Sequence, residues 1–189
     1  LLWGTGGGVK ALAGDYDGDG TTDVALTGQP GWKTIPVAFS EGAKGTYRVT
    51  NSGVPAFAGA AAVAGAKVLA GDVNGDKKTD LIATGGARWG SIAVAISLGN
   101  GTFRIVNAPF PNSFPGLAAA AGSKAVAGDF NGDRKDDVAL TGGNGWTTIP
   151  IAFSNGDGTF RLGNPTIGGG FAGFAASAGV MAVSGAFKG

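Results

Sequence analysis

Nine residues near the start of the chain, 15–23, read Asp-Tyr-Asp-Gly-Asp-Gly-Thr-Thr-Asp and place carboxylates at positions 1, 3, 5 and 9 of one short loop. Like charges at this spacing repel one another, so the loop is expected to be stable only around a cation. Dense hard oxygen ligands favour Ca²⁺, which accepts six to eight oxygens in flexible geometry, over Mg²⁺, which retains water. Gly18 and Gly20 allow the loop to turn back on itself.

The motif returns twice, each time 57 residues further along, as Asp72, Asn74, Asp76, Asp80 and as Asp129, Asn131, Asp133, Asp137. A single copy would be compatible with a solvated acidic turn, whereas three copies in register favour three Ca²⁺ sites per chain. An EF-hand is disfavoured because the glutamate at position 12 is missing and strand patterns flank each loop.

Each repeat contains four short alternating or apolar runs bounded by glycine-rich turns. This is the spacing of a four-stranded antiparallel sheet, and a 57-residue repeat of such sheets predicts an all-β fold, a β-propeller with about three blades per chain. The whole chain, 1–189, is then one propeller segment with blades at about 9–52, 67–107 and 124–162. Residues 180–188 resemble the start of a degenerate fourth repeat, in which Ala186 and Lys188 replace the first two ligand positions.

Alanine-rich segments connect the predicted blades at 54–66, 109–123 and 167–180. Glycine and proline interrupt them at every turn, which predicts packed loops rather than helices. Phe57, Phe114 and Phe171 recur 57 residues apart, as do Trp3, Ala60, Leu117 and Phe174, and these residues are expected to anchor the connectors on the blades. Pro36 and Pro150 fall inside the third-strand pattern, where a missing N–H predicts a bulge or an early end to the strand.

The loop sequences resemble FG-GAP/VCBS repeats, on the evidence of Gly-Asp-Tyr-Asp-Gly-Asp-Gly-Thr-Thr-Asp-Val-Ala-Leu-Thr-Gly and its copy around Asp129. Such repeats build the calcium-binding propellers of integrin α chains and of secreted proteins, and the blade layout is similar to that of Psathyrella velutina-type lectins. The resemblance implies side-chain ligands at positions 1, 3, 5 and 9 and a backbone carbonyl at position 7. Those residues are Asp15, Asp17, Asp19, Thr21, Asp23; Asp72, Asn74, Asp76, Lys78, Asp80; and Asp129, Asn131, Asp133, Lys135, Asp137. The connectors depart from those lectins, since they carry alanine, glycine and phenylalanine where the lectins have polar residues and tryptophan.

Three blades do not close a ring, because closed propellers use about four to eight. Either two chains assemble a six-bladed ring, or the sequence is a segment of a longer chain with further blades. The degenerate fourth loop favours the first alternative.

The composition excludes most catalytic chemistry. The chain has no histidine and no cysteine, which removes the commonest general base and the thiol nucleophile. Eleven of its 13 acidic residues lie in the three loops, and the other two, Glu41 and Asp157, belong to different blades. A glycosidase carboxylate pair is therefore not expected within one chain, and the protein is predicted not to be an enzyme.

Trp32, Trp89 and Trp146 recur in the turn between the second and third strands, which is predicted to lie on the connector face, away from the acidic loops. An indole beside a hydroxyl residue suits stacking on the apolar face of a sugar. The alternative is that each indole wedges between neighbouring blades. The sequence leaves both open.

We therefore expect a non-catalytic, calcium-stabilised, carbohydrate-binding lectin with glycans as partners. The alternatives are a structural or adhesion propeller that binds protein and an accessory repeat domain of a secreted enzyme. A nearly balanced charge, 14 basic against 13 acidic residues, gives no support to nucleic-acid binding, and the absence of an 18-residue apolar run gives none to membrane insertion. Loose calcium loops suit an extracellular location, where the ion is abundant.

Overall fold

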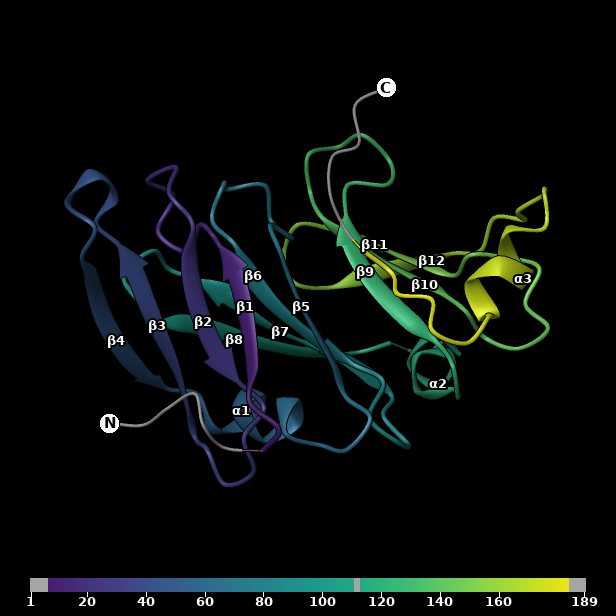
Figure 1. The fold of residues 1–189 in the computed structure, drawn as a ribbon, viewed down its shortest axis with the longest axis horizontal. Coiled ribbons are helices and arrows are strands. Elements are labelled where there is room, and N and C mark those ends of the chain that lie inside the picture. Colours follow the sequence, from purple (N-terminus) through teal and green to yellow (C-terminus); the bar gives the residue numbers. More distant parts are fainter. Residues whose placement is uncertain (1–6, 111–112, 184–189) are drawn as a thin grey trace.

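The structure, a computed structural model, describes residues 7–110 and 113–183, and they form three sheets of four strands each (Figure 1). The first sheet contains β1 (Lys10–Gly14), β2 (Asp23–Thr27), β3 (Thr34–Ser40) and β4 (Tyr47–Gly53). The second contains β5 (Lys67–Gly71), β6 (Asp80–Thr84), β7 (Ser91–Ser97) and β8 (Phe103–Pro109). The third contains β9 (Lys124–Gly128), β10 (Asp137–Thr141), β11 (Ile151–Ser154) and β12 (Phe160–Gly163).

Every sheet is an antiparallel meander in chain order, with the first strand of the repeat at one edge and the fourth at the other. The register repeats as well: Lys10 pairs with Thr27 in the first sheet, and the equivalent lysine pairs with the equivalent threonine in the other two. The predicted all-β propeller architecture with three four-stranded blades is confirmed. We call the sheets blades 1, 2 and 3.

The two prolines shorten the pairing between the second and third strands of their blades. In blade 2, where Ala93 stands at this place, β6 and β7 pair at three positions, the last being Ala83 with Ala93. The ladder of blade 1 stops one pair earlier, before Pro36, and β11 of blade 3 begins only after Pro150. Blade 3 nevertheless retains one contact there, since the backbone N–H of Leu140 donates to the Pro150 carbonyl over 2.9 Å.

The connectors are not plain loops, and this part of the sequence interpretation was wrong. Each contains a short helix: α1 (Pro55–Ala61), α2 (Phe114–Ala119) and α3 (Phe171–Ala176). Helices of six or seven residues are not stable alone in water, so tertiary contacts must hold them. The first lysine of each blade supplies one contact, because Lys10, Lys67 and Lys124 donate their ammonium groups to the carbonyls of Ala61, Ala118 and Ala175 at the helix ends. A cation at a helix C-terminus also interacts favourably with the negative end of the helix dipole.

The apolar core is divided into two clusters, one at each junction between neighbouring blades. The cluster between blades 1 and 2 includes Tyr16, Phe39, Phe57 and Leu81, and the cluster between blades 2 and 3 includes Val73, Phe110, Phe114 and Leu140. Phe57 and Phe114 are fully buried, so both connectors are anchored as expected, whereas Phe171 of α3 is 46% exposed.

Some expectations concern residues that lie outside the described part of the chain. Trp3, Ala186 and Lys188 belong to this group, and residues 180–183 of the predicted fourth repeat carry no strand. Among the described residues, no helix has the length and apolar character needed to cross a membrane.

Candidate cation loops and an inter-blade pocket

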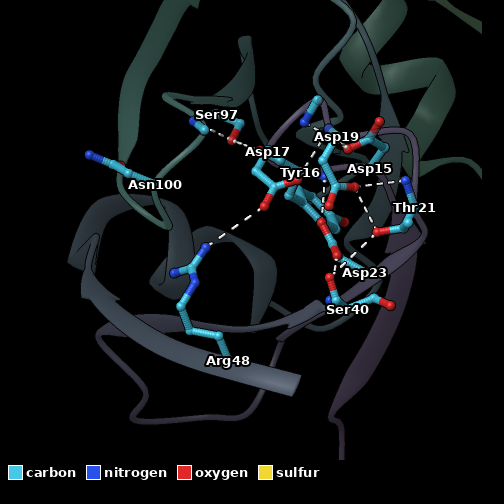
Figure 2. A network of polar contacts seen from close by, with 12 residues as sticks. Asp15, Tyr16, Asp17, Asp19, Thr21, Asp23, Ser40, Arg48, Ser97 and Asn100 are labelled. Carbon is cyan, nitrogen blue, oxygen red and sulfur yellow. Dashed lines mark hydrogen bonds and ion pairs between the residues drawn. The ribbon is translucent and has the colours of Figure 1, made fainter. Parts of the chain in front are cut away.

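The loop between β1 and β2 is held together by its own carboxylates (Figure 2). The two oxygens of Asp15 accept backbone N–H groups from Gly18, Asp19 and Gly20 at 2.7, 3.1 and 2.9 Å. These bonds wrap the chain around the first aspartate. As a result, one carboxylate oxygen from each of Asp15, Asp17 and Asp19 lies within 4.8 Å of the others.

Burial, charge and hydrogen bonding shift the pKa values of Asp17 and Asp19 in opposite directions. Burial raises the pKa of Asp17, and the nearby negative charge of Asp23 adds to the effect. The hydroxyl and backbone N–H of Thr21 donate to Asp19 at 2.6 and 2.7 Å and lower the pKa of that carboxyl. Arg48 of β4 approaches Asp17 at 3.7 Å (Figure 2). The loop therefore concentrates negative charge at the edge of blade 1.

The second and third loops repeat this wrapping with one difference at position 7. Asp72 and Asp129 accept the same set of backbone N–H groups as Asp15. Where the first loop has Thr21, the side chains of Lys78 and Lys135 form ion pairs with Asp76 and Asp133 at 2.8 and 2.9 Å. The hydrogen bond from Lys135 lowers the pKa of Asp133. In these loops an ammonium group already neutralises one carboxylate.

The ninth residue of each loop is buried and acts as an anchor. Asp23, Asp80 and Asp137 are all 0% exposed. One oxygen of each accepts the backbone N–H of loop position 2, and the other accepts the N–H of a serine at the end of the third strand, Ser40, Ser97 or Ser154. Burial raises the pKa of Asp80 to about 7, although its two hydrogen bonds from Ser97 and Val73 oppose the shift.

The loops are also linked from one blade to the next. The backbone N–H of Thr79, in the second loop, donates to the Asp15 carbonyl over 2.6 Å, and Asp136 donates to Asp72 over the same distance. The hydroxyl of Ser97 reaches back to the Tyr16 carbonyl at 2.6 Å, and Ser154 reaches Val73 likewise. Each junction therefore carries two identical polar links on its loop side.

The antiparallel order of the strands places the turns between the second and third strands, which carry the three tryptophans, at the end of each blade opposite the aspartate loops. Each closes a tight turn, with the backbone N–H of Trp32, Trp89 and Trp146 donating to the residue three positions earlier. The rings of Trp89 and Trp146 lie against Gly86 and Gly143, where an added Cβ would come within 2.1 and 2.0 Å of the indole.

Trp89 lines a cavity of about 360 Å³ between α1 and the turn that leads into β7. Apolar walls come from Phe57, Ala60 and Ile105, while Ser91 and the exposed Asn107 add polar groups. The same indole packs against the core cluster of this junction. Trp89 therefore packs between blades 1 and 2, as one of the two interpretations predicts. Its indole also forms part of a pocket wall, which the other interpretation requires.

At the second junction a larger residue stands at the position of Ala60. Leu117 of α2 stands where α1 has Ala60, and it packs together with Trp146 against the second core cluster. Trp32 of blade 1 is half-buried, and the described residues include no blade before blade 1. The structure thus gives the three equivalent tryptophans three different surroundings.

The two acidic residues outside the loops stay apart. Glu41 lies in the turn between β3 and β4 and accepts a hydrogen bond from Thr46, whereas Asp157 lies in the turn between β11 and β12 and accepts the Thr159 hydroxyl at 2.6 Å. They belong to blades 1 and 3, with blade 2 between them. This arrangement places no pair of free carboxylates together in the described part of the chain.

Sequence reasoning missed two sets of positioning residues, the strand-initial lysines and the strand-final serines. Lys10, Lys67 and Lys124 recur at 57 residues, as do Ser40, Ser97 and Ser154. That common period was the available signal, since a polar residue repeated with the blade is expected to make a repeated contact.

The fold and the loops define a β-propeller built from aspartate-loop repeats. The model of the FG-GAP-like repeat matches residues 15–83 and 72–140, which together span more than half of the chain. The chain belongs to this family. No curated protein sequence matches it.

One similar solved structure is a lectin from Agrocybe aegerita, described for its specific recognition of non-reducing terminal N-acetylglucosamine. The two share 20% sequence identity with a TM-score of 0.64. The match covers 90% of this chain and 41% of the lectin, so the chain spans about two fifths of that protein's length. At this identity the likeness shows a shared fold.

Proposed function

We propose that the protein is a non-catalytic carbohydrate-binding propeller whose blades are stabilised by Ca²⁺ and which works outside the cell. The observation that carries the proposal is the pocket at the first junction. It combines an indole wall with a hydroxyl and an amide at its rim, as sugar sites do, and its volume of about 360 Å³ lies in the range of small-ligand pockets. The lectin fold of the Agrocybe aegerita protein supports the same class of function.

The loops fit Ca²⁺ by the chemistry of their donors. Asp15, Asp17 and Asp19 bring three carboxylate oxygens together, which is the hard, anionic ligand set that Ca²⁺ prefers. Asp72, Asn74 and Asp76 offer the equivalent set in the second loop, and Asp129, Asn131 and Asp133 in the third, with the Lys78 and Lys135 ion pairs competing for one oxygen in each. The ion would stabilise the loop edge of each junction rather than take part in a reaction.

The binding test compares the pocket beside Trp89 with the equivalent place beside Trp146 at the second junction. A glycan array and subsequent calorimetry in Ca²⁺ should show saccharide binding by the unaltered chain. Trp89→Ala should abolish it, because the indole forms the pocket wall. Ala60→Leu should weaken it at least tenfold, because Ala60 lines the pocket and the larger side chain would take up part of its volume.

Trp146→Ala is the matched control, since this indole packs with Leu117 against the core cluster of the second junction and does not line the pocket beside Trp89. Its binding should stay within about twofold of the unaltered chain. Saccharide binding that survives both Trp89→Ala and Ala60→Leu would refute the pocket assignment, and an array without any saccharide signal would refute carbohydrate binding.

Calcium is tested separately. Ca²⁺ at 100 times its dissociation constant should stabilise each occupied site by about 2.7 kcal/mol, so chelation should lower the melting temperature. The first loop should bind most tightly, because its cation, Arg48, stands 3.7 Å from Asp17, whereas the lysines of the other loops pair with their carboxylates at 2.8 and 2.9 Å. Calorimetric titration of Asp19→Ala, Asp76→Ala and Asp133→Ala compares the loops, and the mildest loss in Asp19→Ala would contradict this order.

A further inference from the structure

The two outer faces of the chain carry the two halves of one repeated interface. At each internal junction the leading blade offers two backbone carbonyls, from loop positions 1 and 2. The following blade offers the N–H of loop position 8 and a serine hydroxyl. Both internal junctions use this pattern with bonds of 2.6 Å. The interface is therefore a defined module that the fold repeats.

Blade 1 exposes the face that, in blades 2 and 3, packs against the preceding blade. Tyr47, Val49 and Val24 are 60%, 52% and 36% exposed. Their counterparts in blade 2, Phe103, Ile105 and Leu81, belong to or pack against the core cluster of the first junction. A face that is core at one junction is thus open to solvent at the start of the described chain.

Blade 3 exposes the face that, in blades 1 and 2, packs against the following blade. Phe130 is 46% exposed, whereas its counterparts Tyr16 and Val73 are fully buried. On the connector side, Phe171 and Phe174 line an almost wholly apolar groove of about 380 Å³ that also includes Val126 of β9. An exposed apolar surface of this kind marks an interaction site.

The polar groups of the two open faces are complementary. Blade 3 carries the carbonyls of Asp129 and Phe130, equivalent to the acceptors at the internal junctions. Blade 1 carries the N–H of Thr22 and the hydroxyl of Ser40, equivalent to the donors Thr79 and Ser97. One molecule therefore holds both the donors and the acceptors of the repeated contact.

We propose that blade 3 of one copy packs on blade 1 of a second copy, and that two such contacts close a six-bladed ring. A head-to-tail contact makes a ring when its rotation closes, and six blades lie within the usual range for closed propellers. This proposal is independent of carbohydrate binding, which is assigned to an internal junction.

The first test is the mass in solution. Sedimentation velocity of the unaltered chain should give twice the 18.4 kDa of one copy. Val49→Asp places a charge on the open face and should yield monomers, while Leu98→Asp is a matched control, because Leu98 is 54% exposed in the β7–β8 turn of the middle blade. A monomeric unaltered chain, or equal dissociation by both variants, would overturn the proposal.

The second test uses the absence of cysteine from the chain. An added Cβ on Gly14 would lie 2.7 Å from the Thr79 Cβ, and one on Gly71 would lie 3.0 Å from the Asp136 Cβ. The same relation across the open faces joins Gly128 to Thr22. Cβ atoms this near can form a disulfide after a small shift, because bonded cysteines have Cβ atoms about 3.8 Å apart.

The double variant Thr22→Cys, Gly128→Cys should form a covalent dimer under oxidation, seen as one band at twice the mass in a non-reducing gel. The control pair Thr102→Cys, Gly128→Cys moves one cysteine to an exposed turn of the middle blade and should stay monomeric in that gel. A ladder of longer polymers would overturn ring closure, and a monomer band alone would overturn the contact.

Discussion

The two internal junctions share their polar links and differ in how their connector sides are filled. On the loop side, Ser97 and Ser154 make the same 2.6 Å bond to the preceding blade. On the connector side, the first junction has Ala60 beside a cavity, whereas the second has Leu117 packed against its core cluster. The comparison teaches that the loop edge keeps the same polar contacts at both junctions, while the connector edge accepts different side chains.

The cores of the junctions also reach the same burial with different side chains. Position 2 of the loop is Tyr16 at the first junction and Val73 at the second, and both are fully buried. Burial, together with the negative charges of Asp23 and Asp80, raises the pKa of Tyr16 far above its usual value, and the neutral hydroxyl donates to the Leu12 carbonyl. The second junction instead contains Phe110 and Phe114 packed edge to face, with ring centroids 5.7 Å apart.

The largest effect is expected from Asp80→Ala, which would damage both junctions at once. Its carboxylate accepts the N–H groups of Ser97, which is linked to blade 1, and Val73, which is linked to blade 3. Two buried donors left without an acceptor cost about 1–3 kcal/mol each, so we expect a loss of about 2–6 kcal/mol in the free energy of unfolding. Urea denaturation measures it. Asp80→Asn keeps one acceptor oxygen and should cost less, and equal losses would contradict the anchoring role.

Leu117→Ala should make the second junction resemble the first. Fully buried leucines lose about 2–5 kcal/mol on truncation, and because Leu117 is half-buried we expect a loss of about 1–2 kcal/mol. The variant should also gain a second saccharide site beside Trp146, measurable as a doubled stoichiometry in calorimetry. Unchanged stoichiometry would show that residue 117 does not control access.

Ser97→Ala and Ser154→Ala test whether the shared links are equivalent. Each variant removes the buried hydrogen bond to a backbone carbonyl and a second one accepted from the N–H of Gly99 or Gly156. For the two together we expect a loss of about 1–2 kcal/mol in the free energy of unfolding. Denaturation of the two single variants and the double variant should give equal and additive losses. A difference above about 1 kcal/mol between the single variants would break the symmetry of the two junctions.

The smallest expected effect concerns backbone strain in the loops. Lys77 and Arg134 adopt φ angles of +69° and +67°, in the left-handed region, where the first loop has Gly20. Glycine adopts this conformation without a Cβ penalty, so Lys77→Gly and Arg134→Gly should each raise the free energy of unfolding by about 0.5–1 kcal/mol. Gly20→Lys should lower it. Denaturation melts under chelation would measure these changes, and destabilisation by both glycine variants would contradict the strain.

The sequence by itself determined the repeat, the three aspartate loops and the four-stranded blades. These features are local: the spacing of Asp15, Asp17 and Asp19 within one loop and the alternation of short apolar runs are written in neighbouring residues. The place of the tryptophans beside the connectors also followed, because antiparallel strands of known order fix which edge each turn occupies.

Only the tertiary structure decided the connectors, the prolines and the pocket. The helices of the connectors depend on lysines about 51 residues away, such as Lys10 on Ala61, and no local pattern reports such a contact. Pro36 lies within β3, whereas β11 begins only after Pro150. This difference depends on how the strands pair. The pocket beside Trp89 exists because Ala60 from one blade's connector meets a turn of the next, and the size of a gap is set by both surfaces together.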